Sequence, residues 1–314
     1  MNTQAGFGIA NSRVCFANRV GRKAHPIVTM AEEIGHTSVL SGFTSMVEPS
    51  REDASIDLAT AALAIARTEY PALDAPYYLR RLEVLAERVR NRMRRNPTAR
   101  EVIALLNRVL FDEEGLRGNR DDYYDPRNSF LNDVLDRKLG IPITLSVIYM
   151  DVARRVGLPI VGTGMPGHFL LKHFDVMSGE IVIDPFNRGR IVGSAECQQR
   201  LDEIYSGQME LQPEFLHAVT HREILTRVLN NLRQIYFAKC DLPKGLIVLD
   251  LLLAIPPYSP DLLRERGLVR LNLEQFLGAA QDLGGYLQLR PDSPDSGDVR
   301  ETLDMLRQLL ARLN

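Results

Sequence analysis

A change in hydrophobic period near residue 160 constrains the fold of this chain more than any other feature. Before it, apolar residues recur at helical spacing until Gly157 and Pro159 supply a stop signal. After it come short runs rich in β-branched and apolar residues, separated by Met-Pro-Gly and Met-Ser-Gly turns. These runs cover residues 160–164, 168–173 and 180–184. Helices followed by a small antiparallel sheet predict an α+β domain.

Several amphipathic helices are expected ahead of this point. Asp74 is an N-cap candidate with Pro76 in the first turn behind it, and Thr98 with Glu101 forms a capping box. Gly115 is placed to end the helix that the capping box begins. The predicted helices cover residues 54–70, 74–93, 98–115, 129–139 and 142–156.

The region after Thr220 is helical again and carries a partial repeat. Aligning Pro256 with Pro291 gives an offset of 35 residues, close to the period of about 34 residues that tetratricopeptide repeats have. Leu252 then matches Leu287, although the Trp-Leu-Gly signature of such repeats is missing. Two helical hairpins are marginal alone, so they are expected to dock on the first domain or on a partner.

Composition excludes several classes of function. The 314 residues are 45% hydrophobic, which predicts two globular modules. A formal net charge of -2 gives no electrostatic footprint for nucleic acid or an anionic membrane. The longest apolar run, 246–255, contains Asp250 and is about half the length of a bilayer span, so a buried helix is expected. Three scattered cysteines without a CxxC pair fit a reducing cytoplasm.

Residues 1–49 are expected to form a tail and a segment leading into the first domain, partly disordered. The first thirty residues lack acidic side chains, and no apolar segment of secretory type follows them. Met30 opens a more ordinary acidic start, Met-Ala-Glu-Glu. Initiation at Met30 would remove the tail without touching the core, and the sequence leaves both starts open.

The segment 140–190 carries Ala153, Arg154, Gly157 and Pro159 at the end of a predicted helix, His168 at the start of one predicted strand, and Asp184 with Pro185 at the end of another. These residues resemble the core of the transglutaminase-like superfamily, which has a papain-type fold. In that core, a helix ending in Ala-Arg-x-x-Gly-Ile-Pro precedes a strand that opens with the catalytic His and another that ends in Asp-Pro. With the stretches GNRDDYYDPRNSFLN, MPGHFLL and IDPFNRG included, the chain resembles the SirB-type family, which carries C-terminal tetratricopeptide repeats. The resemblance implies a transglutaminase-like α+β domain at 50–205 and an all-α repeat-like domain at 206–314.

The resemblance also implies which residues carry the chemistry. In active members of the superfamily, a Cys at the helix N-terminus attacks an amide carbonyl, a His transfers the proton, and an Asp orients the imidazole. His168 and Asp184 match the last two roles. Pro142 stands at the nucleophile position, and proline has no nucleophilic group. A buried His beside a carboxylate can also be a purely structural pair.

Other nucleophiles are poorly placed in the sequence. Ser146 would lie on the face of Pro142 but one turn deeper, and Thr144 would lie about two residues round the helix. Cys197 and Cys240 are interpreted as small packed residues, and only closeness to His168 would change that interpretation.

A polar loop precedes the nucleophile position. Residues 118–132 are dense in Asn, Asp, Tyr and Arg, whose side chains compete with helix formation by bonding to nearby backbone. Because loops carry many binding groups, the loop is a candidate rim of a site, and the alternative is a surface loop with turn chemistry. The candidate groove residues are Asn119, Asp121, Asp122, Tyr123, Tyr124, Asn128 and Asn132.

Neither a metal nor a cofactor is expected. His168 and His173 are five residues apart, so on one strand their side chains point to opposite faces. The combined features predict a non-catalytic transglutaminase-like protein of the bacterial cytoplasm that acts as a binding or regulatory scaffold. Its partner would be a protein or peptide held by the repeats, with no role for nucleic acid or membrane. The alternative is an amide hydrolase or acyl transferase that uses Ser146 or Thr144 with His168.

Overall fold

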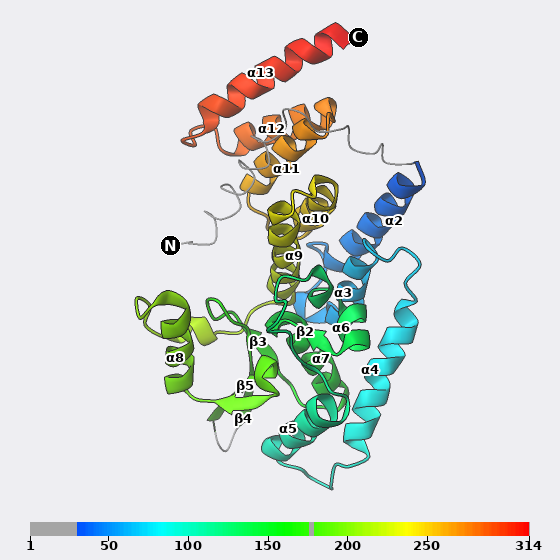
Figure 1. Ribbon diagram of the computed structural model, residues 1–314, viewed down its shortest axis with the longest axis vertical. Coiled ribbons are helices and arrows are strands. Elements are labelled where there is room, and N and C mark those ends of the chain that lie inside the picture. Colours follow the sequence, from blue (N-terminus) through cyan, green and yellow to red (C-terminus); the bar gives the residue numbers. More distant parts are fainter. Residues whose placement is uncertain (1–29, 176–178, 314) are drawn as a thin grey trace. The chain divides into compact units, whose positions relative to one another are not determined.

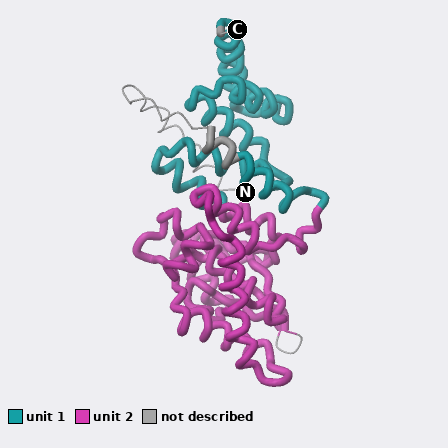
Figure 2. Tube along the Cα trace, turned by 90° about the vertical axis from the view of Figure 1, so that its right-hand side faces the viewer, with its two compact units in different colours: residues 1–50, 229–314 teal, residues 51–228 magenta. Residues whose placement is uncertain are grey.

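The computed structural model describes residues 30–175 and 179–313, so most of the predicted tail lies outside the described residues. Contacts between Cα atoms divide the chain into two compact units (Figure 2). Unit 2 comprises residues 51–228, and unit 1 comprises 229–314 with the described part of 1–50. The predicted domain boundary at 205/206 precedes this division in the sequence.

The reason for the later division is that the segment before residue 228 packs along the sheet edge. Val219 donates its backbone N–H to the carbonyl of Gly162 at 2.9 Å, and Ala218 forms an antiparallel bridge with Thr163. These backbone bonds extend the sheet by a short segment of later sequence, which propensity alone does not reveal.

Two helices of unit 2 begin at the caps that the sequence predicts, Asp74 and Thr98, and a third begins after Asp57. Asp57 accepts from Thr60 N–H at 2.8 Å, and Asp74 accepts from Tyr77 N–H at 3.0 Å. The capping box predicted at Thr98 is present, with both of its hydrogen bonds. These helices are α3 (Leu58–Ala66), α4 (Ala75–Arg90), α5 (Ala99–Asn107), α6 (Leu131–Arg137), α7 (Pro142–Arg155) and α8 (Ser194–Tyr205) (Figure 1).

Short elements connect these helices. The π-helix η2 (Arg108–Glu113) continues α5 directly, and β1 (Arg117–Gly118) pairs in parallel with β2 (Leu139–Gly140). The remaining 3-10 turns are η1 (Asp53–Ser55), η3 (Pro126–Asn128), η4 (Pro185–Asn187) and η5 (Pro213–Leu216).

A four-stranded antiparallel sheet lies between α7 and α8. Its strands run in the order β3 (Val161–Thr163), β4 (Leu170–Asp175), β5 (Gly179–Asp184) and β6 (Arg190–Val192). Leu170 packs with Cys197 of α8, whereas its neighbour Leu171 points to the opposite, buried face. The helix α7, which contacts β3 and β4, covers that second face. The three predicted strands are present, and β6 is a fourth that the sequence analysis missed.

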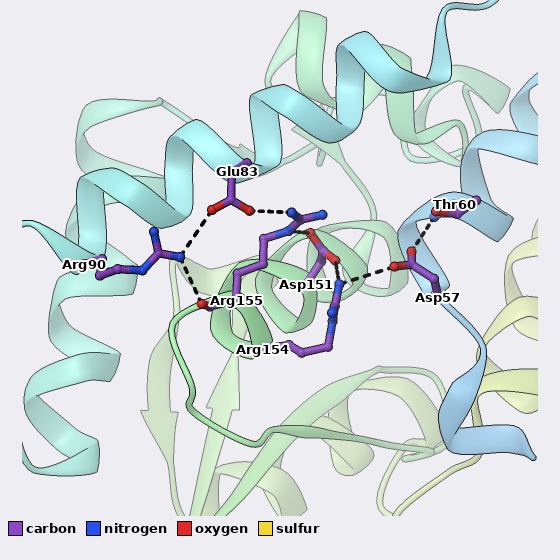
Figure 3. Close-up of polar contacts among 7 residues, drawn as sticks. All are labelled: Asp57, Thr60, Glu83, Arg90, Asp151, Arg154 and Arg155. Carbon is purple, nitrogen blue, oxygen red and sulfur yellow. Dashed lines mark hydrogen bonds and ion pairs between the residues drawn. The ribbon is translucent and has the colours of Figure 1, made fainter.

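The C-terminal end of α7 is fastened by a network of ion pairs (Figure 3). Asp151, a buried carboxylate, accepts from Arg155 Nε at 2.6 Å and from Arg154 Nη2 at 2.7 Å. Arg155 also donates to Glu83 of α4 at 2.6 Å, and Arg154 reaches Asp57 before α3 at 3.3 Å. The network therefore ties α7 to two other helices of unit 2.

Unit 1 is entirely helical in its described part. It holds α2 (Met30–Val47), the later turns of α9 (His221–Ala238), α10 (Leu242–Ala254), α11 (Asp261–Asn272), α12 (Phe276–Leu289) and α13 (Ser296–Leu313). The apolar run 246–255 lies in the buried helix α10, as predicted, except for Ile255, which is its C-cap residue. Among the described helices, none has both the length and the apolar character needed to cross a bilayer.

Buried charges join the helices of unit 1. Arg266 of α11 donates to Asp250 of α10 at 2.7 Å and to Asp282 of α12 at 2.6 Å. Arg270 lies one turn further along α11 and donates to Asp282 at 2.9 Å. The two carboxylates are at least nine-tenths buried, so the arginines neutralise charges that water does not reach.

Candidate functional site

The predicted pair of His168 and Asp184 is formed. His168 follows a turn in which its N–H donates to the carbonyl of Met165 at 3.2 Å and Gly167 adopts a φ of +71°. Asp184 ends β5. Nε2 of His168 lies 3.0 Å from Oδ2 of Asp184, and both side chains are 5% exposed. The two groups are therefore close enough to interact directly.

The carboxylate of Asp184 is held by the turn that follows it. Asn187 donates its backbone N–H to Oδ1 at 3.2 Å and its side-chain amide to Oδ2 at 2.6 Å. Burial alone would raise the pKa of Asp184, but His168 and the two bonds from Asn187 outweigh it and lower the pKa. Asp184 is therefore a charged, preorganised group.

Asn107, the last residue of α5, supports the same turn. Gly189 donates its N–H to the carbonyl of Asp184 at 2.8 Å and accepts from the amide of Asn107 at 2.7 Å. Asn107 in turn accepts from the hydroxyl of Tyr149 at 3.0 Å. Gly189 has a φ of +72°, and a Cβ there would stand 1.9 Å from Asn107 Oδ1, so only glycine fits.

A cavity of about 250 Å³ opens beside the pair, between the sheet and α8. Two ion pairs stand around it: Arg190 with Glu196, and Arg200 with Glu203 at 3.2 Å. Each pair is internally neutral. The lining residues are Met165, His168, Leu170, Asp184, Asn187, Arg190, Val192, Glu196, Cys197, Gln199, Arg200 and Glu203.

Cys197 lies in the wall of this cavity, which brings a thiol into the same space as His168. The sequence favours a packed residue at this position, and Cys197 is 2% exposed. Burial, together with the charges of Glu196 and Asp184, raises the pKa of its thiol. The thiolate that nucleophilic attack requires is therefore disfavoured.

The hydroxyl candidates on α7 do not line this cavity. Pro142 occupies the first turn of α7. The hydroxyl of Thr144 donates to the carbonyl of Asn128 at 2.7 Å and accepts from Ile141 N–H at 3.2 Å, which makes it a helix cap. Ser146 has no exposed surface, and its hydroxyl makes no hydrogen bond within the described residues.

Buried amides hold the polar loop in shape. Asn119 donates to the side chain of Asn128 at 3.0 Å and accepts from the N–H of Asp122 at 3.1 Å. Asn128 donates to the carbonyl of Asp122 at 2.7 Å. Asn132 is also buried, whereas Asp121 and the side chain of Asp122 are exposed. The two amides Asn119 and Asn128 thus form the loop's internal framework.

Phe186 lies between the loop tyrosines and His168 in a row of aromatic contacts. The ring of Tyr123 lies 5.4 Å from that of Tyr124 and 6.3 Å from that of Phe186, and Phe186 lies 6.2 Å from the His168 ring. Each contact is edge-to-face, a favourable geometry for aromatic rings. Gly118 makes room for this row, since a Cβ there would stand 2.5 Å from Phe186.

The part of the site that α8 supplies was not predicted from the sequence. Glu196, Arg200 and Glu203 are spaced i, i+4 and i+7, which places them on one helix face. That spacing was a usable signal, but nothing local showed that this face meets His168. Asn187, three residues after Asp184 in IDPFN, was missed for the same reason.

The second histidine lies apart from the pair. Nδ1 of His173 contacts the carbonyl of Pro159 at 2.7 Å, on the sheet face opposite the cavity. Across the residues that the structure describes, no group of three His, Cys, Asp or Glu side chains has the arrangement of a metal site.

Comparison with known proteins agrees with this architecture. The family model described as the transglutaminase-like superfamily matches residues 77–230, and the tetratricopeptide repeat model matches residues 232–304. The α+β domain followed by a helical repeat region, as predicted, is therefore confirmed. No solved structure matches the chain.

Bacterial relatives match most of the chain. A UPF0162 protein of Xylella fastidiosa (strain 9a5c) is 39% identical over 252 residues, 79% of this chain and 89% of the relative. A UPF0162 protein of Pseudomonas aeruginosa is 34% identical over 57% of this chain and 64% of the relative. Protein SirB1 of Salmonella typhimurium is 26% identical over 66% of this chain and 76% of its own length. The chain belongs to the UPF0162 family, the SirB-type transglutaminase-like proteins with C-terminal tetratricopeptide repeats.

Proposed function

We propose that this chain is a non-catalytic transglutaminase-like protein that acts as a binding or regulatory scaffold in the cytoplasm. The protein or peptide partner would bind at the helical repeats, the class of module that commonly binds other proteins. Resemblance to a protein named SirB1 supports a regulatory role by analogy.

The proposal rests on the burial and hydrogen bonding of the two hydroxyl groups on α7, those of Thr144 and Ser146. Thr144 is 2% exposed and its hydroxyl is used as a helix cap, and Ser146 is fully enclosed. A nucleophile must be within reach of both its base and its substrate. Neither hydroxyl satisfies the second condition, and Pro142 at the start of α7 has no side-chain nucleophile.

The retained pair then has a positioning role. Asp184 and its bonds from Asn187 keep the turn after β5 in one shape, and His168 joins that turn to the start of β4. Removing one partner of a buried polar pair costs about 1–3 kcal/mol, so selection for stability alone would retain it. The cavity and the loop tyrosines would serve as a groove for binding rather than for turnover.

Acyl trapping tests the proposal. The full chain is incubated with p-nitrophenyl acetate, an activated acyl ester, and the intact mass and peptide map are recorded. We expect no adduct at Thr144, Ser146 or Cys197 that depends on His168. The matched variants are His168→Ala, which removes the base, and Cys197→Ala, which removes the thiol. An adduct that forms on the natural chain and disappears in His168→Ala would support a hydrolase or acyl transferase instead.

A further inference from the structure

The cavity beside His168 has a floor that the sheet supplies. Asp184 pairs across the strands with Arg190, and both side chains leave the sheet on the face of Leu170. All three residues line the cavity. Directly opposite neighbours on adjacent strands have Cβ atoms about 4.5–5.5 Å apart. An acidic and a basic side chain therefore start side by side at this floor.

One face of α8 forms the opposite wall. Glu196, Arg200 and Glu203 share that face, and all three line the cavity. Arg190 reaches from β6 to Glu196, so this ion pair joins the floor to the wall. The side chains of the pair are 68% and 36% exposed. Ion pairs as exposed as this one are weak, so either partner can turn toward a ligand at small cost.

Both arginines of the cavity keep donors for a ligand. Within residues 30–175 and 179–313, Arg190 donates a side-chain hydrogen bond to Glu196 alone. Arg200 likewise donates only to Glu203, from Nη1 at 3.2 Å. A guanidinium has further N–H groups, and they match the two oxygens of a carboxylate in a bidentate geometry. The two arginines thus supply a place for an anionic group.

The acidic groups of the lining suit an ammonium group. Asp184 is a buried carboxylate, and the side chain of Glu203 is 52% exposed at the rim. Two arginines and three carboxylates line the cavity, which gives a formal charge of −1 with His168 neutral. A ligand with several charges of one sign would face lining charges of the same sign, whereas a zwitterion meets both signs.

The same cavity has an apolar part. Met165, Leu170 and Cys197 belong to one buried cluster, and Val192 packs against it. All four line the cavity. The volume of about 250 Å³ lies just below the range of about 300–1,000 Å³ that is typical of pockets for drug-sized ligands. The cavity therefore suits one small molecule that combines charges of both signs with a short apolar chain.

We propose that this cavity binds a free α-amino acid with an apolar side chain. Arg190 and Arg200 would hold its carboxylate, Asp184 and Glu203 its ammonium group, and the buried cluster its side chain. Such binding rests on the proposed function, in which the cavity binds its ligand rather than turning it over. The two can fail separately. An acyl adduct that depends on His168 would end the non-catalytic proposal, whereas a lack of amino acid binding would end this assignment alone.

Isothermal titration calorimetry of the full chain tests the assignment. The probes are L-leucine, L-valine and L-methionine, at constant pH and ionic strength. Three further compounds each remove one feature of leucine: glycine lacks the apolar side chain, 4-methylpentanoate lacks the ammonium group, and L-leucinamide lacks the carboxylate. We expect at least one probe to bind saturably. Each of the three further compounds should bind at least about tenfold more weakly than the tightest probe.

The thiol of Cys197 reports where the ligand binds, because it lines the cavity. Its alkylation by iodoacetamide is followed by peptide mapping, which separates this thiol from those of the other cysteines. The tightest probe, at a concentration that saturates the calorimetric signal, should slow alkylation of Cys197.

Variants on α8 separate recognition from folding. Arg200→Gln removes a partner of the carboxylate and Glu203→Gln a partner of the ammonium group, so each should weaken binding at least about tenfold. The matched controls are Arg307→Gln and Asp304→Asn on α13, where an exposed ion pair of the same spacing lies 3.1 Å apart. Both controls should bind like the natural chain. The proposal is overturned if no probe binds, if one of the three further compounds binds as tightly as the tightest probe, if the rate of Cys197 alkylation is unchanged, or if the α8 variants bind like the controls.

Discussion

The ion-pair network at the end of α7 makes a quantitative prediction about Arg155 (Figure 3). Its side chain is 18% exposed and bonds Asp151, whose own side chain is 3% exposed, at 2.6 Å. Arg155→Ala leaves that carboxylate buried with Arg154 alone, and Arg154 is 60% exposed. Breaking a buried ion pair costs about 3–5 kcal/mol of unfolding free energy. Because Arg154 still pairs with Asp151, we expect a loss at the lower end of this range, about 3 kcal/mol. The second contact, to Glu83, adds little because Glu83 is 40% exposed.

Thermal unfolding followed by circular dichroism checks this value. At about 2–4 °C per kcal/mol for a unit of this size, Arg155→Ala should lower the Tm by about 6–12 °C. Arg154→Ala is the matched control, since it removes an exposed arginine from the same carboxylate and should cost about 0.5 kcal/mol. Equal shifts in the two variants would refute the reasoning, because burial of the pair would then not decide its contribution.

Three further predictions follow from particular contacts. Gly189→Ala should destabilise the chain by about 2–3 kcal/mol in urea unfolding, because the left-handed backbone and Asn107 both exclude a Cβ; Gly284→Ala, in open space on α12, should instead stabilise by about 0.5–1 kcal/mol. The lowered pKa of Asp184 contributes stability that is present above the ordinary carboxyl pKa and is lost as pH falls through the lower folded value. The difference in unfolding free energy between the natural chain and Asp184→Asn should therefore be largest near neutral pH and shrink in acid, and a difference that grows in acid would contradict this assignment. Arg266→Met should speed amide hydrogen exchange in α10 and α12 more than in α4, because two buried carboxylates lose one of the two arginines that they share.

Local rules predicted most of the helical framework. The caps at Asp74 and Thr98 depend on residues three positions apart, and the structure forms both. The stop after α7 likewise follows from Gly157, which adopts a φ of +84° that glycine accommodates without strain. Such features are readable because both partners lie in one short stretch of sequence.

Long-range contacts account for what the sequence did not reveal. The strand β6 has only three residues and follows Arg188, a non-glycine residue at a φ of +59°, so neither length nor turn composition marks it. The sequence shows that α8 has a polar face. That this face lines the same cavity as His168 depends on the packing of α8 against the sheet, which the sequence does not show. The closeness of Cys197 to the pair was posed as a question by the sequence and needed coordinates to answer.

The helix α9 has a consequence for dividing the chain into fragments. It runs without interruption from His221 to Ala238, while the division between the units falls at 228/229, inside it. Domain boundaries usually fall in exposed, flexible linkers that few contacts cross. Here a cut at the boundary would break the helical hydrogen bonds of α9 and leave backbone N–H and C=O groups without partners. A fragment that carries either unit should therefore keep α9 whole.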